Sequence, residues 1–207
     1  MVYDITPAQL LADGFLILGY AFLGAAIKII DEAYDTSSYK KETAAIIAVP
    51  AAMILAALIV SDPPSAAILL AIAFAAAATH KLDNVVFQSL LMLSLAITAF
   101  YPKTTMPWLP FAVLTIAAIV DEYGNDWSDR RRKKPIPNTQ QNPLVQTLDE
   151  ALHYRPLIPV TAIMLAATGM LPILNLVATF ALDLTYHTTQ KITHTPTAKK
   201  HRKLQQT

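Results

Sequence analysis

The stretch from Ala44 to Val60 reads AAIIAVPAAMILAALIV, seventeen residues without a charged or hydrogen-bonding side chain. A run of this length and composition approaches the ~20 apolar residues that carry a helix across a bilayer. Its internal proline, Pro50, is compatible with a membrane helix, where neighbouring groups satisfy the freed carbonyl. Six further apolar blocks lie along the chain: Phe15 to about Ile30, Ala66–Thr79, Val85–Tyr101, Trp108–Val120, Leu157 to about Leu171, and Pro172 to about His187.

The composition of the whole chain agrees with these blocks. Of its 207 residues, 54% are apolar and 15% are charged, whereas soluble domains carry about 25% charged residues. We therefore predict an all-α fold: a polytopic transmembrane bundle of about seven short spans over residues 1–187, with a basic cytoplasmic tail over 188–207. The chain has no cysteine and a net charge of +1, which excludes thiolate chemistry and gives no field favouring nucleic acid as a partner.

Basic residues are concentrated in alternate connections between the blocks. Lys40 and Lys41 follow the first block, none lies between the second and third, and Arg130 to Lys134 follow the fifth. The segment after His187 is also basic. Because basic loops mark the cytoplasmic side, we predict an integral, multi-pass membrane protein with its N-terminus outside and its C-terminus in the cytoplasm.

The long connection after the fifth block contains one more expected element. Leu144–Tyr154 (LVQTLDEALHY) places Leu144, Leu148 and Leu152 on one helical face. This segment is too short to cross a bilayer and carries Asp149 and Glu150. We predict that it forms an amphipathic helix on the cytoplasmic membrane surface.

Two acidic motifs follow apolar blocks and resemble each other. The first is IIDEAYD, ending at Asp35, and the second is IVDEYGND, ending at Asp126. Residues four apart share a helix face, so Asp31 pairs with Asp35, and Glu122 with Asp126. The similarity suggests a weak internal repeat with halves 1–101 and 102–187.

These carboxylates suggest one chemistry and leave one plain alternative open. Oxygen ligands suit Mg²⁺, which keeps waters and bridges to substrate phosphates, and the expected metal ligands are Asp31, Asp35, Asp121, Glu122, Asp126 and Asp129. Nearby cations would meet the phosphate oxygens: Lys40, Lys41, Arg130, Arg131 and Arg132. The alternative is that the acids are only interfacial and the basic runs only fix topology.

The stretch DEYGNDWSDRRRKKPIPN, from Asp121 to Asn138, resembles the first aspartate motif of the UbiA-type intramembrane prenyltransferases. IIDEAYDTSSYKK resembles, more weakly, the second aspartate motif of that family. The resemblance implies an Mg²⁺-dependent transferase that binds a prenyl diphosphate within a helical bundle. It implies a catalytic role for Asp31, Asp35, Glu122 and Asp126.

Two other classes of function remain open from the sequence. A repeat-built transporter or channel would fit two similar halves, although Lys28 and Asp183 are the only ionisable residues found within the blocks and both lie near block ends. A non-catalytic membrane subunit would use alanine-rich faces, such as Ala75 to Ala78, to bind partner helices. The oligomeric state cannot be read from the sequence.

Overall fold

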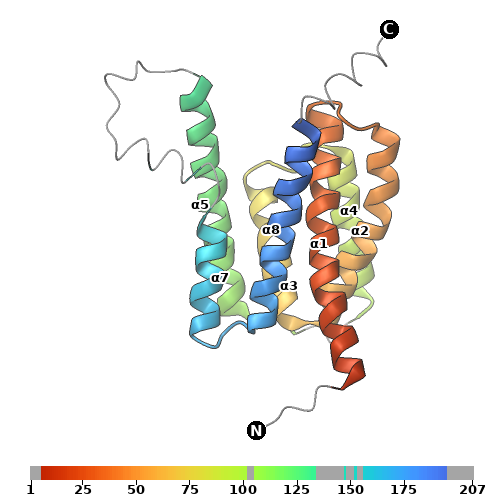
Figure 1. Cartoon of the computed structure of the whole chain (residues 1–207), viewed down its shortest axis with the longest axis vertical. Helices are drawn as coiled ribbons and strands as arrows, with labels where there is room; N and C mark the ends of the chain where they lie inside the picture. The colour runs from red at the N-terminus through yellow and green to blue at the C-terminus, as the bar shows by residue number, and fades with distance from the viewer. Residues whose placement is uncertain (1–5, 102–104, 134–146, 148–151, 153–155, 195–207) are drawn as a thin grey trace. The chain divides into compact units, whose positions relative to one another are not determined.

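A computed structural model describes residues 6–101, 105–133, 147, 152 and 156–194 of the chain (Figure 1). Within these ranges it contains seven α-helices and no strand, which confirms the predicted all-α class. The helices are α1 (Pro7–Asp35), α2 (Lys41–Ser61), α3 (Pro63–Ala78), α4 (Val85–Ala99), α5 (Trp108–Lys133), α7 (Leu157–Ala167) and α8 (Ile173–His194).

Local sequence explains where several helices begin. At α1, the Thr6 hydroxyl accepts from the Gln9 backbone N–H at 3.3 Å, and the Gln9 side chain accepts from the Thr6 N–H at 3.0 Å. This reciprocal capping box satisfies two N–H groups that a helix start leaves open. At α4, the Asn84 side chain accepts from the Phe87 N–H at 2.8 Å. The first turn of α2, after Lys40, has no such side-chain cap.

Three helices extend beyond the apolar blocks that predicted them. α1 continues through the acidic motif to Asp35, α5 continues through its acidic and basic residues to Lys133, and α8 ends at His194 rather than near His187. The ends differ because helix propensity and charge pairs three or four residues apart extend a helix past its apolar part. The predicted surface helix 144–154, apart from residues 147 and 152, and the tail after 194 lie outside the described residues.

The chain divides into two compact units. Unit 1 contains α1, α2, α4 and α8 together with Asp62 and Asp83. Within unit 1, α1 packs most extensively on α8, and α2 packs on both α1 and α4. α1 and α8 run in the same direction, because Thr185 donates to the Ala21 carbonyl at 2.7 Å while the later residue Thr193 meets Tyr39. The division into units does not follow the proposed halves, 1–101 and 102–187, and the internal repeat stays a prediction.

Unit 2 contains α3, α5 and α7, with Lys81 at the end of the segment that follows α3. α5 packs on both α3 and α7. The rings of Phe74 and Phe111 meet edge to face at 6.4 Å between α3 and α5. Leu152 lies against Gly124 of α5, so close that a β-carbon at Gly124 would stand 2.7 Å from its Cδ2.

Small residues are frequent inside both units, and many large apolar residues face outward. Ala44, Ala52 and Ala71 are fully buried, whereas Leu11, Ile46 and others are more than two-thirds exposed. Two of the described helices, α1 and α2, are long and apolar enough to cross a membrane. The described part also has three shorter apolar helices: α3, α4 and α7.

Candidate functional site

Charged side chains are buried near the end of α1. Lys28 is 6% exposed, and its ammonium nitrogen lies 2.9 Å from Asp31 Oδ2 and 3.2 Å from Glu32 Oε1. Glu32 is 2% exposed. The three side chains meet because residues three and four apart stack on one side of a helix. An ammonium in this position is stabilised only when it is paired, since burial of a lone charge is costly.

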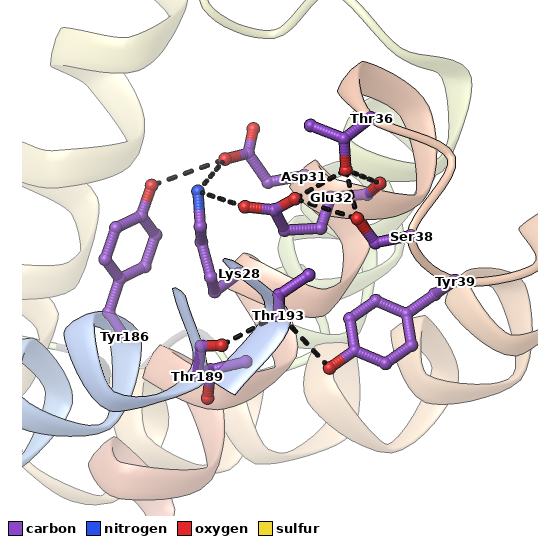
Figure 2. A network of polar contacts seen from close by, with 9 residues as sticks. All are labelled: Lys28, Asp31, Glu32, Thr36, Ser38, Tyr39, Tyr186, Thr189 and Thr193. Atoms are coloured by element: carbon purple, nitrogen blue, oxygen red, sulfur yellow. Dashed lines mark hydrogen bonds and ion pairs between the residues drawn. The ribbon is translucent and has the colours of Figure 1, made fainter. Parts of the chain in front are cut away.

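Hydroxyl groups that follow α1 complete the surroundings of Glu32. The Thr36 hydroxyl donates to Glu32 Oε2 at 2.6 Å, and the Ser38 hydroxyl donates to the same oxygen at 3.2 Å (Figure 2). Ser38 reaches this position through a tight reversal of the chain, in which Ser37 adopts a positive φ of 53°. The turn after α1 therefore folds back onto the carboxylate of Glu32.

α8 contributes an aromatic side chain, Tyr186, to the same site. The Tyr186 hydroxyl donates to Asp31 Oδ2 at 3.4 Å, and the Lys28 ammonium lies 5.1 Å from the centre of the Tyr186 ring. This is cation–π geometry, in which the ring face stabilises the ammonium. Figure 2 shows the resulting polar cluster, which we define as Lys28, Asp31, Glu32, Thr36, Ser38 and Tyr186. Nearby, the Tyr39 and Thr193 hydroxyls lie 3.3 Å apart.

The charges of the polar cluster do not cancel when all three groups are ionised. One ammonium stands against two carboxylates, of which Glu32 is 2% exposed and Asp31 is 30% exposed. The sequence predicted Asp31 as a metal ligand, which stays a prediction, and predicted no role for Glu32 or Tyr186. The spacing of Lys28 and Glu32 within an apolar helix was the available signal for Glu32, whereas Tyr186 comes from a distant helix.

The other predicted site residues of unit 1 lie at the surface. Asp35, Lys40 and Lys41 are exposed, and the Lys41 ammonium lies 5.1 Å from the centre of the Tyr34 ring. Asp31 and Asp83 lie near enough for their charges to act on the carboxyl of Asp35. The end of α1 and the start of α4 therefore bring these aspartates to one end of unit 1.

In unit 2, one predicted metal ligand has a clear structural partner. Asp121 is fully buried, and its two carboxylate oxygens accept from the backbone N–H groups of Leu157 at 3.0 Å and Ile158 at 2.8 Å. Those N–H groups open α7, where a helix lacks internal acceptors and favours negative charge. Asp121 thus caps a helix 36 residues away in the chain.

The remaining predicted residues of unit 2 lie along the later turns of α5. Asp126 forms an ion pair with Lys81, at a site where both side chains are about one-third exposed. Glu122 and Asp129 are half-buried, and Arg130 is exposed. The guanidinium of Arg131 lies 4.8 Å from the centre of the Trp127 ring. The side chain of Arg132 lies outside the described part of the chain.

The predicted four-carboxylate site draws on both units. Asp31 and Asp35 belong to unit 1, and Glu122 and Asp126 belong to unit 2, so their joint binding of Mg²⁺ stays a prediction. Among the residues that the structure describes, no group of three or more carboxylate or imidazole side chains is arranged to hold a metal ion.

Comparison with protein-family models, curated proteins and solved structures finds no match for this chain. The resemblance of its acidic motifs to the prenyltransferases stays a prediction.

Proposed function

We propose that the chain is a multi-spanning helical membrane protein, with seven spans, its N-terminus outside and its C-terminus in the cytoplasm. The outward large apolar residues and the alanine-rich interior support this, since bilayer helices pack through small residues and expose apolar ones to lipid. α1 and α2 have the length and composition that a span requires. A water-soluble bundle would show the reverse distribution.

The arrangement of unit 1 also supports the proposed orientation. Lys40 and Lys41 lie where α1 ends and α2 begins. At the other end of α2, Asp62 accepts a hydrogen bond from the side chain of Asn175, near the start of α8. The connections that lead into α3 and α8 at that end carry no lysine or arginine. The basic end is the expected cytoplasmic end.

Within this membrane protein, we propose that the polar cluster binds a proton or a small monovalent cation during transport. The observation that carries the proposal is the pairing of the buried Lys28 with the buried Glu32 and with Asp31, whose side chain is 30% exposed. Ionisable groups inside a membrane bundle are costly and are characteristic of ion pathways and proton relays. The pairing gives Lys28, near the end of the first apolar block, two carboxylate partners just beyond that block.

The spacing of charges along α1 strengthens this argument. Asp13 and Lys28 are fifteen positions apart, about 22 Å along a helix. The hydrocarbon layer is about 30 Å thick, so an upright α1 cannot keep both charges outside it. Near Lys28, the same helix supplies carboxylates of opposite charge, those of Asp31 and Glu32.

The residues of the cluster have distinct parts in the proposed mechanism. Glu32 and Asp31 share the Lys28 ammonium, and an arriving cation neutralises the remaining negative charge. Because the cation competes with Lys28 for carboxylate oxygens, its binding weakens one ion pair and its release restores that pair. The hydroxyls of Thr36 and Ser38 hold Glu32 in place throughout.

Transport is tested with the purified protein in vesicles that hold a pH-sensitive or a sodium-sensitive dye. A potassium diffusion potential drives cation influx. Vesicles with the wild-type protein are expected to show faster influx than empty vesicles, as reported by one of the two dyes. Glu32→Gln removes the excess negative charge while keeping the shape of the side chain, and is expected to reduce flux to the level of empty vesicles. Glu42→Gln, at an exposed position in the first turn of α2 and outside the polar cluster, is the matched control. Absence of wild-type flux, or full flux in Glu32→Gln, rejects the proposal.

A second candidate function is the Mg²⁺-dependent prenyltransferase reaction implied by the family resemblance. One observation favours it: Asp35 is exposed, in the electrostatic range of Asp31 and Asp83, and Lys40 directly precedes the next helix. Carboxylate-bound Mg²⁺ and fixed cations would stabilise a departing diphosphate. An apolar bundle would keep water from the carbocation.

This candidate is tested by Mg²⁺-dependent binding of farnesyl or geranylgeranyl diphosphate to the purified protein. Asp35→Asn and Asp126→Asn are expected to weaken binding, and Asp183→Asn to leave it unchanged. Binding that needs no Mg²⁺, or that both variants retain, rejects the enzyme. If flux and diphosphate binding are both absent, a non-catalytic membrane subunit becomes the better interpretation.

A further inference from the structure

One side of α5 is exposed along most of the helix. Large side chains on that side recur at intervals of three and four residues and therefore share one face. From the start of α5 they are Leu109, Val113, Ile116, Val120, Tyr123 and Trp127, all between 37% and 64% exposed. The buried positions of α5, such as Leu114, Ala118 and Asp121, lie on the opposite side of the helix.

The chemical character of this exposed face changes in order along the helix. It is aliphatic as far as Val120 and aromatic at Tyr123 and Trp127. The exposed Arg130 and the half-buried Arg131, three and four residues after Trp127, continue it. The guanidinium of Arg131 lies over the Trp127 ring, 4.8 Å from its centre. Membrane spans show this order where they leave the hydrocarbon layer, because aromatic rings favour the interface and cations favour the headgroups.

The two tryptophans of the chain are separated by a length that fits a bilayer. Trp108 opens α5 and is 70% exposed, and Trp127 lies nineteen positions later in the same helix. This separation is about 28 Å along a helix, close to the ~30 Å thickness of the hydrocarbon layer. With Trp127 at one interface, Arg131 lies about 6 Å beyond it, in the headgroup layer.

We propose that the basic end of this face, formed by Trp127, Arg130 and Arg131, binds the phosphate of an anionic phospholipid in the cytoplasmic leaflet. The inference rests on the proposed membrane topology, not on transport, and names a lipid partner for one surface. A guanidinium carries its N–H donors at its edge, so it can lie over a ring and still donate to phosphate oxygens. Two adjacent cations favour an anionic lipid over a zwitterionic one, whose own ammonium group opposes them.

The carboxylates nearest to these arginines in the sequence lie elsewhere or have another partner. Asp126 forms its ion pair with Lys81 of the same unit. Asp129 is half-buried and lies two positions after Trp127, on the opposite side of the helix. The exposed side of this part of α5 therefore presents positive charge to a membrane surface.

The site is tested by quenching of tryptophan fluorescence with brominated lipids. The full chain is placed in symmetrical vesicles as two single-tryptophan proteins: Trp108→Phe, which reports from Trp127, and Trp127→Phe, which reports from Trp108. The vesicles contain equal amounts of phosphatidylcholine and phosphatidylglycerol, and one of the two lipids is brominated at a time. The ratio of the two quenching constants measures the preference for anionic lipid. Trp127 is expected to prefer anionic lipid at least about fivefold, the effect of one cation at an anionic surface, and Trp108 is expected to show no preference.

The positive charge is removed by the double substitution Arg130→Gln and Arg131→Gln in the protein that retains Trp127. This variant is expected to lose the preference while both lipids still quench its fluorescence. Lys191→Gln, at an exposed position of α8, is the matched control and is expected to keep the preference. Each preference is a ratio within one protein, so a change in the brightness of Trp127 cancels.

The possible outcomes separate the lipid site from the proposed topology. Equal quenching of Trp127 by the two lipids, or a preference that the double variant retains, overturns the anionic-lipid site and leaves the span intact. Quenching of Trp108 without quenching of Trp127 also overturns the site, because protein, such as a second copy of the chain, then covers this face. If neither tryptophan is quenched, α5 does not span the bilayer, and the proposed topology fails together with the site.

Discussion

The ammonium nitrogen of Lys28 lies 3.2 Å from Glu32 Oε1, and the two side chains are only 8% and 2% exposed. A buried ion pair of this kind contributes little net stability compared with apolar residues, but removal of one partner leaves an expensive charge. Asp31 makes the two partners unequal, because it offers Lys28 a second carboxylate at 2.9 Å. Removal of one carboxylate is therefore expected to lower the stability of the protein less than removal of the lysine.

The first prediction follows from that inequality. Lys28→Met leaves two carboxylates without their ammonium and is expected to destabilise the protein by about 3–5 kcal/mol. Glu32→Gln leaves Lys28 paired with Asp31 and is expected to cost clearly less. Thermal unfolding in detergent, followed by helical circular dichroism, measures both. Asp183→Asn, whose side chain is 47% exposed, controls for loss of an exposed charge. Equal stability of Lys28→Met and wild type would contradict the buried pair.

The second prediction separates two aspartates of α5. Asp121 accepts two backbone hydrogen bonds from the start of α7 and is fully buried, so Asp121→Ala is expected to cost about 2–3 kcal/mol. Asp121→Asn keeps one acceptor oxygen and is expected to cost about half as much. Asp126→Asn disrupts an ion pair whose side chains are 30% and 36% exposed, and is expected to cost ~0–1 kcal/mol.

Thermal unfolding again distinguishes these variants. The helix-capping role of Asp121 is wrong if Asp121→Ala is as stable as Asp126→Asn. A prenyltransferase reaction would give the opposite order in activity, because Asp126, unlike Asp121, belongs to its expected catalytic carboxylates. Stability and diphosphate binding together therefore separate the structural aspartate from the candidate catalytic one.

The same two aspartates indicate how much the sequence could predict. Apolar runs such as Ala44–Val60 predicted the seven helices of the described residues and their order, because burial of apolar surface needs only local composition. The pairing of Lys28 with Asp31 was readable from their spacing. The roles of Asp121 and Asp126 were not, since their partners lie 36 and 45 residues away in the chain. Such contacts depend on packing between helices, which periodicity within one helix does not specify.

A third prediction concerns the contact between α1 and α8. A β-carbon at Gly24 would stand 2.1 Å from a backbone oxygen of α8, whereas one at Gly14 would meet nothing within 4 Å. Gly24→Ala is therefore expected to destabilise unit 1 by about 1–3 kcal/mol, the usual cost of overpacking. Gly14→Ala, in the same helix, is expected to be neutral or to stabilise by up to ~1 kcal/mol, the propensity gain. Matching stabilities for the two variants would contradict the close packing of α1 on α8.

The last prediction tests the proposed orientation at the two ends of one helix. Lys40 and Ser61 flank or end α2 and are both exposed, and the 21 residues of α2 span about 30 Å, the thickness of the hydrocarbon layer. In inside-out and right-side-out vesicles, Lys40→Cys is expected to react with a membrane-impermeant thiol reagent only from the cytoplasmic side, and Ser61→Cys only from the outside. The cysteine-free parent chain supplies the blank. Both positions reacting from one side would mean that α2 does not cross the membrane. If Lys40→Cys reacted only from the outside and Ser61→Cys only from the cytoplasmic side, α2 would still cross the membrane but the topology would be inverted. The polar cluster would then face the outside.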